Sequence, residues 1–356
     1  MGVSLHLRSA IAAHYSEEAR SQWFNSTDVE WEALTHEAVI SRLAPLLYYS
    51  LKKFPREDVP DASLEHLRTV YYATAARNMQ MHQQLKRVTD ALDEIGIHYI
   101  LLKGAALIQD VYEGNMALRP MSDIDILIDP KMFPSVRKKL LEFSHLESVV
   151  MDDAINTAQH ARVFYFAGNC RFEIHTRLVS YHHYVYHPKF NTLGARERLD
   201  INWTFLYLCT HELLHHNGSS CRFGADAALI IQLGVHWSKV IELAQNNHMI
   251  IPLQWGIEIL KSNWFSVIPD NVRDQVSTLQ STYLERFFFT CSQHPPLRRF
   301  GIWLALPSIQ VKLAYLYNTF LPSKKYLEEH WANEESDTHY SRLYFRRLLG
   351  KTYRTI

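Results

Sequence analysis

The spacing of apolar residues changes period twice along the chain, and this change limits the possible folds more than any other feature. Two stretches near the start, from Trp31 to Phe54 and from Ala62 to Ile95, place apolar side chains three and four residues apart, as amphipathic helices do. Strand-like patterns follow, and helical spacing returns after about Asp200. The sequence therefore predicts an α+β fold in which a small mixed sheet is flanked by N-terminal and C-terminal helical regions.

The strand-like segments in the middle of the chain are short and end at turn-forming residues. HYILLKG (98–104) is an apolar run that ends in glycine, and SDIDILID (122–129) alternates between polar and apolar residues. ARVFYFAGNCRFEIHTRL (161–178) predicts a hairpin that turns at its Gly-Asn pair. We expect an N-terminal helical region, a central core, a C-terminal helical region and a basic tail, at residues 1–95, 96–195, 196–340 and 341–356.

The overall charge and the apolar segments exclude some classes of protein. Lysine plus arginine and aspartate plus glutamate both total 37, and a neutral chain lacks the basic surface needed for tight, sequence-independent binding of nucleic acid. The first residues lack the pattern of a signal peptide. The apolar stretch 301–321 is interrupted by Pro307, Gln310 and Lys312, so it predicts core helices and no membrane span. We therefore expect no membrane partner. Because the four cysteines have no paired spacing, we expect reduced thiols and a cytoplasmic location.

Two aspartates in the alternating strand 122–129 supply candidate chemistry. Asp123 and Asp125 are two residues apart, so their side chains project from one face, and two negative charges so close are unfavourable without a cation between them. Carboxylate oxygens on a rigid element are the ligands that Mg²⁺ prefers. Glu173 shares a face with His175 in the segment CRFEIHTRL and offers a third carboxylate on a neighbouring strand. The pattern predicts a metal site made of these three carboxylates.

A turn suited to phosphate precedes the two aspartates. Lys103, Gly104 and Ala105 lie where the predicted strand passes into a helix. A glycine at this place lets phosphate approach the backbone, and the helix N-terminus offers free N–H groups. Lys103 and Arg119 add positive charge that can hold a triphosphate. Strand, glycine turn, helix and Asp-x-Asp strand, in this order, predict a site for phosphoryl transfer.

The segment LLKGAALIQDVYEGNMALRPMSDIDILI (101–128) resembles the signature of the uncharacterised nucleotidyltransferase family of the DNA polymerase beta superfamily. That family's pattern is a Leu-Lys-Gly turn, a helix with a tyrosine, an arginine and then Asp-Ile-Asp. FEIHTRL (172–178) resembles its later Glu-x-His strand. Weaker similarity, including HELLHH followed by RFGADAALI, extends over most of residues 30–332.

This resemblance implies a metal-dependent nucleotidyltransferase with a DNA polymerase beta-like fold. Mg²⁺ or Mn²⁺ would support transfer of a nucleoside monophosphate from an NTP to an acceptor hydroxyl by a two-metal mechanism. Asp123, Asp125 and Glu173 are then the catalytic metal ligands. The residues implied in nucleotide binding are Lys103, Gly104, Ala105, Arg119, Ser122 and His175. The acceptor, whether a small molecule, a protein or RNA, and the oligomeric state are left open.

A zinc hydrolase is the first alternative. HELLHHNGSSC matches the H-E-x-x-H metal motif, and on a helix His211 and His215 share a face that could hold Zn²⁺. Glu212 would then act as general base, and Cys221 stands where a third ligand is expected. Because the resemblance already places histidines at this point, we expect the helix to line the nucleotide cleft instead.

A catalytically weak nucleotide-binding protein is the second alternative. The superfamily usually has Gly-Ser or Gly-Gly at the phosphate turn, and this chain has Gly104 followed by Ala105, which lacks a serine hydroxyl for a phosphate contact. Two further segments carry weaker signals. The His- and Tyr-rich segment 181–187 predicts a loop beside the site, and the basic tail 341–356 predicts an amphipathic helix.

Overall fold

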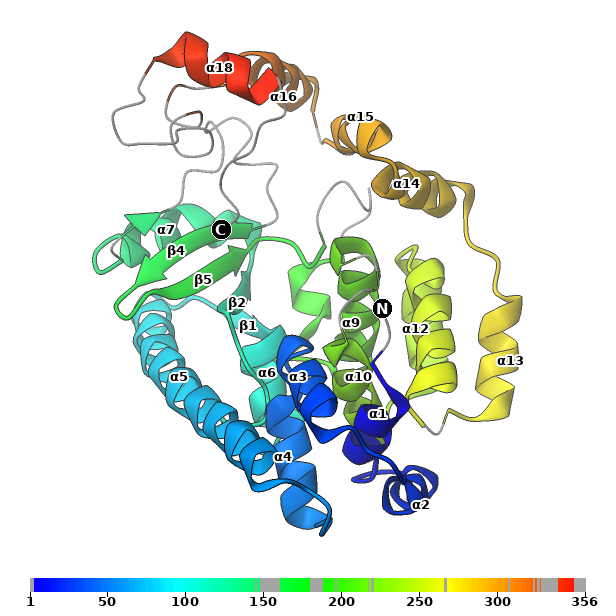
Figure 1. Ribbon diagram of the computed structural model, residues 1–356. Coiled ribbons are helices and arrows are strands. Elements are labelled where there is room, and N and C mark those ends of the chain that lie inside the picture. Colours follow the sequence, from blue (N-terminus) through cyan, green and yellow to red (C-terminus); the bar gives the residue numbers. More distant parts are fainter. Residues whose placement is uncertain are drawn as a thin grey trace.

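The computed structural model contains one mixed sheet, preceded in the chain by helices α1 to α5 and followed by helices α9 to α18 (Figure 1). This confirms the predicted α+β class with helical flanks. The histidine-rich segment 181–187 and residues 349–356 of the basic tail lie outside the described residues, and residues 341–348 of the tail are helical as predicted. The structure describes residues 3–144, 146–147, 161–179, 188–195, 197–216, 218, 221–265, 268–306, 308–322, 324, 327 and 339–348.

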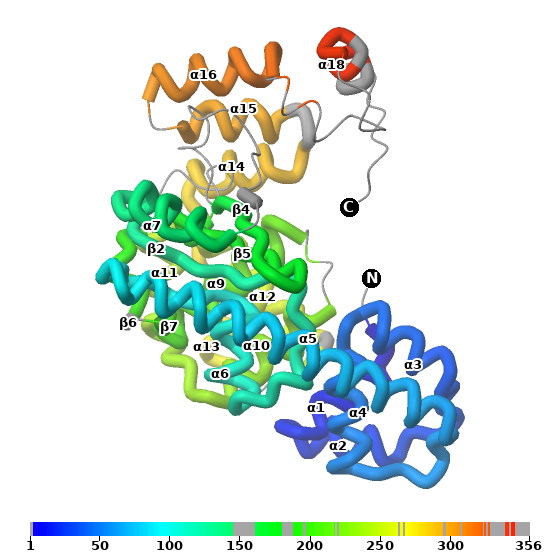
Figure 2. Tube along the Cα trace, turned by 90° about the vertical axis from the view of Figure 1, so that its left-hand side faces the viewer, coloured from blue at the N-terminus to red at the C-terminus, as the bar shows by residue number. Residues whose placement is uncertain are grey.

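The first helices pack against one another, and the long helix α5 connects them to the sheet. Its 34 residues extend from contacts with α3 and α4 to the face of the sheet (Figure 2). The helical character predicted for the first 95 residues is confirmed. These helices are α1 (Leu5–Ala12), α2 (Glu17–Asn25), α3 (Trp31–Ile40), α4 (Ala44–Lys53) and α5 (Asp61–Glu94).

The apolar spacing from Trp31 to Phe54 belongs to two helices, because the chain turns between α3 and α4. Arg42 adopts φ 57°, in the left-handed region, which ends a right-handed helix. Pro45 then occupies the first turn of α4, where its missing N–H costs nothing. The turn places Arg42 on the surface of a cleft described below.

The described strands form one mixed sheet in the order β3-β4-β5-β2-β1-β7-β6. The β2–β5 and β1–β7 pairs are parallel and the others antiparallel. The predicted hairpin is confirmed, and its turn residues Gly168 and Asn169 both have positive φ. The strands are β1 (Tyr99–Leu102), β2 (Asp123–Ile128), β3 (Leu146–Glu147), β4 (Ala161–Phe166), β5 (Cys170–His175), β6 (Gly194–Ala195) and β7 (Glu197–Leu199).

The two faces of the sheet belong to two different hydrophobic cores. Ile124, Ile126 and Ile128 of β2 pack with residues of α5 and of α7 (Phe133–Leu140). Leu127, on the opposite face, joins the core formed with the helices that follow the sheet. The polar and apolar residues that alternate in β2 therefore lie on opposite faces of the sheet. The face that carries Asp123 and Asp125 lies toward the helices that follow the sheet.

Short helices lie in several of the connections between strands, and most of the described residues after β7 are helical. Strand β7 lies beyond residue 195, so the sheet extends slightly past the predicted core boundary. The shorter connections are α6 (Lys103–Asp110), η1 (Pro130–Met132) and η2 (Phe190–Thr192). The C-terminal helices are α9 (Ile201–His216), α10 (Arg222–Gln232), α11 (Trp237–Asn246), α12 (Ile250–Asn263), α13 (Asp270–Thr278), α14 (Tyr283–Gln293), α15 (Pro295–Ala305), α16 (Ile309–Phe320) and α18 (Tyr340–Leu348).

Helix α16 corrects one expectation. The described residues of the stretch 301–321 are largely helical as predicted, and Tyr315 of α16 joins a small hydrophobic core with Phe288 and Leu306. The other face of α16 is not in a core, since Ile309, Leu313 and Phe320 are each more than half exposed. Its apolar content was taken as a sign of burial, whereas α16 lies with α14 and α15 at one end of the molecule (Figure 1). Across the described residues, every helix is too short or too polar to cross a membrane.

Candidate active site

The parallel pairing of β2 with β5 brings two of the three predicted carboxylates together, those of Asp125 and Glu173, and Asp123 lies outside this group. Asp125 lies directly opposite Glu173 in the register of the two strands, and His175 follows on the same face of β5. Ligand atoms of Asp125, Glu173 and His175 all lie within 4.8 Å of one another. The prediction that Glu173 lies on a strand next to Asp125 is therefore confirmed.

Lys103 and His175 both contact the buried carboxylate of Asp125. The Nζ atom of Lys103 lies 2.7 Å from Oδ1 of Asp125, and Nε2 of His175 lies 2.8 Å from the same oxygen. His175 Nε2 is also 3.5 Å from Oε2 of Glu173, whose other oxygen accepts a hydrogen bond of 2.5 Å from Arg171. One imidazole and two cationic side chains thus hold two carboxylates in place.

Asp123 occupies a different environment from Asp125. It begins β2 and is half-buried, and its Oδ1 accepts a hydrogen bond of 3.2 Å from the hydroxyl of Ser122. Burial and the negative charge of Asp125 raise the pKa of Asp123. Burial alone would also raise the pKa of Asp125, but Lys103 and His175 hold it below its usual range. Of the two aspartates, Asp123 is therefore the one that lacks a bonded cation.

The turn between β1 and α6 has the close approach that a phosphate site needs. Lys103 has φ 46°, in the left-handed region, which is a strained conformation for a residue with a side chain. A Cβ atom on Gly104 would lie 2.7 Å from Nη1 of Arg119 and 2.8 Å from Cγ of Met121. The missing side chain of Gly104 therefore lets the side chains of Arg119 and Met121 lie directly against this turn.

Arg119 is buried and held by an acidic residue of α10. Its Nε donates to both oxygens of Asp226 at 3.1 Å, and its Nη2 donates to Oδ2 at 2.9 Å. The hydroxyl of Tyr112 donates to Oδ1 of Asp226 at 2.6 Å. Two nitrogens of Arg119 thus face Asp226, while Nη1 lies beside Gly104. A phosphate contact by Arg119 remains a prediction, and Nη1 is the nitrogen that would make it, because Nε and Nη2 are bonded to Asp226.

A buried asparagine of α5 fixes the loop that carries Arg119. Nδ2 of Asn78 donates to the carbonyl oxygens of Met116 at 2.7 Å and of Arg119 at 2.8 Å. Its Oδ1 accepts from the amide of Met121 at 3.3 Å. Because a buried side-chain amide needs such partners, the three bonds set the path of the loop. No motif pointed to Asn78, since its role depends on contacts 38 to 43 residues away.

A cleft of about 1240 Å³ contains these residues. Its walls come from all three parts of the chain: the α3–α4 turn, the sheet with its phosphate turn, and helices α9 and α10. Arg42 and Arg222 line it together with Lys103 and Arg119. The sequence did not single out Arg42, because an arginine in a helix-to-helix turn carries no pattern of its own.

The histidines of α9 line this cleft, as expected for that helix. His211 and His215 are stacked, with ring centroids 4.7 Å apart and planes inclined by 15°. A metal lies in the plane of each ring that binds it, so two nearly parallel rings do not direct their nitrogens at one ion. Among the described residues, His211, His215 and Cys221 do not form a group of three ligands. The geometry therefore disfavours the zinc alternative.

The family comparison covers the entire cleft. A family model described as an uncharacterised nucleotidyltransferase matches residues 27–262. This span begins just after α2 and ends in α12, so it includes every residue that lines the cleft except Val3, while α13 to α18 lie outside it. No curated protein and no solved structure matches the chain.

Proposed function

The chain belongs to the uncharacterised nucleotidyltransferase family, and from this premise we propose that it transfers a nucleoside monophosphate from an NTP to an acceptor hydroxyl. One observation carries the proposal most directly. Asp125 and Glu173 meet across paired parallel strands, at the foot of a Lys-Gly turn that opens a helix, within a single cleft. Carboxylates beside a phosphate turn are what nucleotidyl transfer requires.

The donor set fits a hard divalent cation. Asp123, Asp125 and Glu173 offer carboxylate oxygens, and Asp125 and Glu173 lie on rigid neighbouring strands. We propose that these three side chains hold Mg²⁺ or Mn²⁺. When bound, the metal would supply positive charge to the reacting phosphate and orient its oxygens.

The chain's own residues would position the reactants. The backbone at Gly104 and the first turn of α6 would bind phosphate oxygens, with Lys103 and Arg119 adding positive charge. Ser122 and His175 would keep Asp123 and Asp125 in their rotamers. The acceptor oxygen attacks the α-phosphorus, the bond between this phosphorus and the bridging oxygen of the β-phosphate breaks, and pyrophosphate leaves. Glu173 would orient the acceptor hydroxyl and receive its proton.

The size of the cleft supports a reaction with two substrates. Sites for one small molecule usually measure about 300–1,000 Å³, and this cleft is larger, at about 1240 Å³. It therefore has room for an NTP and for part of an acceptor. The histidines of α9, which line the same cleft as the carboxylates, would contact the acceptor.

Transfer of label from NTPs tests the proposal. The purified protein is incubated with Mg²⁺ or Mn²⁺, a cell lysate as the source of acceptor, and each of the four NTPs labelled at the α-phosphate. We expect label to enter an acceptor with at least one NTP, and to stay in the nucleotide pool with Asp123→Asn. Equal labelling by wild type and variant would contradict the proposed role of the carboxylates.

A further inference from the structure

Three arginines from three parts of the chain line the same cleft. Arg42 comes from the turn between α3 and α4, Arg119 from the loop before β2, and Arg222 from the start of α10. Burial lowers the pKa of Arg222 to about 10, and the nearby positive charges of Arg119 and Arg42 contribute to this shift. Like charges are gathered here although their mutual repulsion is unfavourable.

Among the described residues, one carboxylate is hydrogen-bonded to these arginines. Asp226 is bonded to Arg119 through three contacts and to Tyr112 through one. Nη1 of Arg222 donates to the carbonyl oxygen of Pro120 at 2.7 Å, and a carbonyl group carries no net charge. An anionic ligand would therefore complete the balance of charge.

Other acidic residues also line the cleft. Glu37 accepts hydrogen bonds of 2.6 Å from the amide and the hydroxyl of Ser4 through its two oxygens. Glu212 is buried in α9. Asp125 and Glu173 form a cluster with His175, and Asp123 begins the same strand as Asp125. Asp125 and Glu173 have cationic partners of their own, Lys103 and Arg171.

The phosphate turn connects the sheet carboxylates to the arginines. Nη1 of Arg119 lies beside Gly104, and the neighbouring Lys103 is bonded to Asp125. Arg222 is bonded to the carbonyl oxygen of Pro120, the residue that follows Arg119, so these two arginines are neighbours. A polyphosphate chain that starts at Asp125 and passes Gly104 would therefore meet Arg119.

We propose that Arg42, Arg119 and Arg222 form a subsite for the terminal phosphates of the NTP, and that Asp226 is the positioning residue that aims Arg119 into it. This inference rests on the proposed function and extends it. The three guanidiniums bind the β- and γ-phosphates and neutralise the pyrophosphate as it leaves. Asp226 occupies Nε and Nη2 of Arg119 and so leaves Nη1 for the ligand. The N-terminal helices thereby contribute to the active site through Arg42.

Binding of inorganic tripolyphosphate with Mg²⁺ tests the subsite without knowledge of the base. Calorimetry compares the wild-type protein with Arg222→Gln and Arg42→Gln. Because a hydrogen bond to a charged group contributes about 1.5–3 kcal/mol, we expect each variant to bind roughly 10- to 100-fold more weakly. Arg42 is exposed, so its replacement should leave the fold intact even if Arg222→Gln does not fold.

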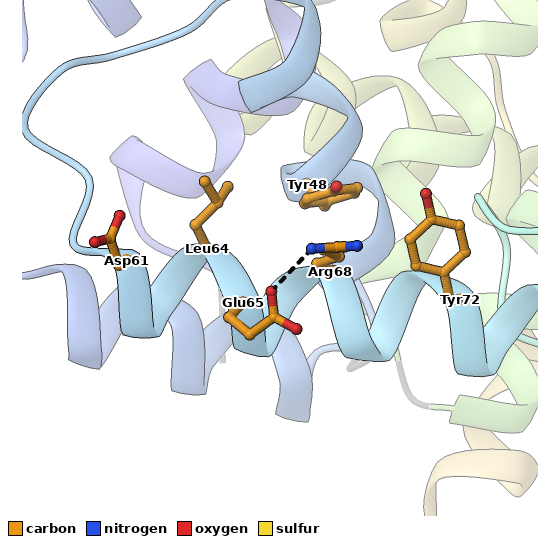
Figure 3. A pocket seen from close by; sticks show the side chains of 6 residues that line it. All are labelled: Tyr48, Asp61, Leu64, Glu65, Arg68 and Tyr72. Atoms are coloured by element: carbon orange, nitrogen blue, oxygen red, sulfur yellow. Dashed lines mark hydrogen bonds and ion pairs between the residues drawn. The ribbon is translucent and has the colours of Figure 1, made fainter.

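Arg68→Gln is the matched control. Arg68 lies on α5 between Tyr48 and Tyr72 in a separate pocket of about 510 Å³ (Figure 3), where it pairs with Glu65 at 3.3 Å. Its loss removes the same charge outside the cleft, so we expect the affinity for tripolyphosphate to stay within about twofold of wild type. A control that weakens binding as much as Arg42→Gln would indicate a general effect of charge and overturn the subsite.

The outcome separates this inference from the proposed function. If Arg42→Gln and Arg222→Gln bind tripolyphosphate like wild type while transfer still depends on Asp125, the subsite is wrong and the proposed function stands. If the arginine variants lose binding but no NTP is consumed, the subsite stands and the proposed function fails. In an active protein, Arg42→Gln should raise KM for the NTP more than it lowers kcat, which a purely structural role would not produce.

Discussion

Nζ of Lys103 and Oδ1 of Asp125 form a buried ion pair 2.7 Å long. This ion pair links the phosphate turn, which begins at Lys103, to the carboxylates of the sheet, where Asp125 lies opposite Glu173. Because of this ion pair, the negative charges of the two aspartates in the Asp-x-Asp motif are balanced differently. Asp125 has a cation and an imidazole bonded to it, whereas Asp123 has the hydroxyl of Ser122.

Replacement of the two aspartates should therefore change stability in opposite directions. Asp125→Asn leaves Lys103 buried without its partner, which is expected to destabilise the metal-free protein by on the order of 3 kcal/mol. Asp123→Asn removes a charge that Asp125 repels, so it should leave stability unchanged or raise it. Urea unfolding in the presence of EDTA measures both. Equal destabilisation by the two variants would contradict this difference between the aspartates.

Gly104→Ala should impair nucleotide binding without abolishing folding. The added Cβ would lie 2.7 Å from Nη1 of Arg119 and 2.8 Å from Cγ of Met121, so these two side chains have to shift. A shift of the guanidinium displaces Nη1 of Arg119 from the phosphate turn, and we expect a loss of about 10- to 100-fold in kcat/KM for the NTP. A variant as active as wild type would show that the close packing at position 104 has no role in the reaction.

Guanidinium ion should restore activity to Arg119→Ala only when Asp226 is present. The vacated space retains the carboxylate of Asp226 and the hydroxyl of Tyr112, which would hold the small cation where the side chain was. The measurement is transfer activity with millimolar guanidinium chloride, far below denaturing concentrations. The double variant Arg119→Ala, Asp226→Asn is the control. Equal rescue of both variants would contradict the positioning role of Asp226.

Glu285 should make stability fall as pH rises through the slightly acidic range. Oε1 of Glu285 accepts a hydrogen bond of 2.6 Å from the amide of Ile251 in the first turn of α12, and burial raises the pKa of Glu285 from 4.5 to about 7. Between these two values the folded protein holds a proton that the unfolded chain has lost, so stability decreases with rising pH.

The variant Glu285→Gln keeps an acceptor oxygen and cannot ionise. Its stability relative to wild type should therefore increase from about pH 4.5 to about pH 7 and level off above that range. Urea unfolding of both proteins across this range is the measurement. A difference that stays constant with pH would show that Glu285 does not titrate between these values.

Much of the fold and part of the site could be predicted from local patterns. The period of β2 placed Asp125 on the face opposite Ile124, and the alternation in β5 placed Glu173 with His175. These assignments succeeded because a strand's side chains alternate strictly. The resemblance to the nucleotidyltransferase family added what alternation cannot give, namely that the two strands are neighbours.

What could not be predicted depends on contacts between distant segments. Asp226 meets Arg119 across 107 residues, and Asn78 meets the same loop across about forty. A single aspartate in the apolar helix RFGADAALI was a sign that a buried acid would need a partner, but the partner's identity follows only from how α10 packs. The exposure of α16 was missed for the same reason, since apolar content does not reveal which helices it contacts.

The position of the label in the NTP tests nucleotidyl transfer most directly. The same NTP is supplied to wild type and to Asp125→Asn with label in either the α- or the γ-phosphate. We predict that wild type places the α-label in the acceptor and releases the γ-label as pyrophosphate, and that Asp125→Asn does neither. Transfer of the γ-label to the acceptor, or α-labelling that persists in Asp125→Asn, would contradict nucleotidyl transfer by this site.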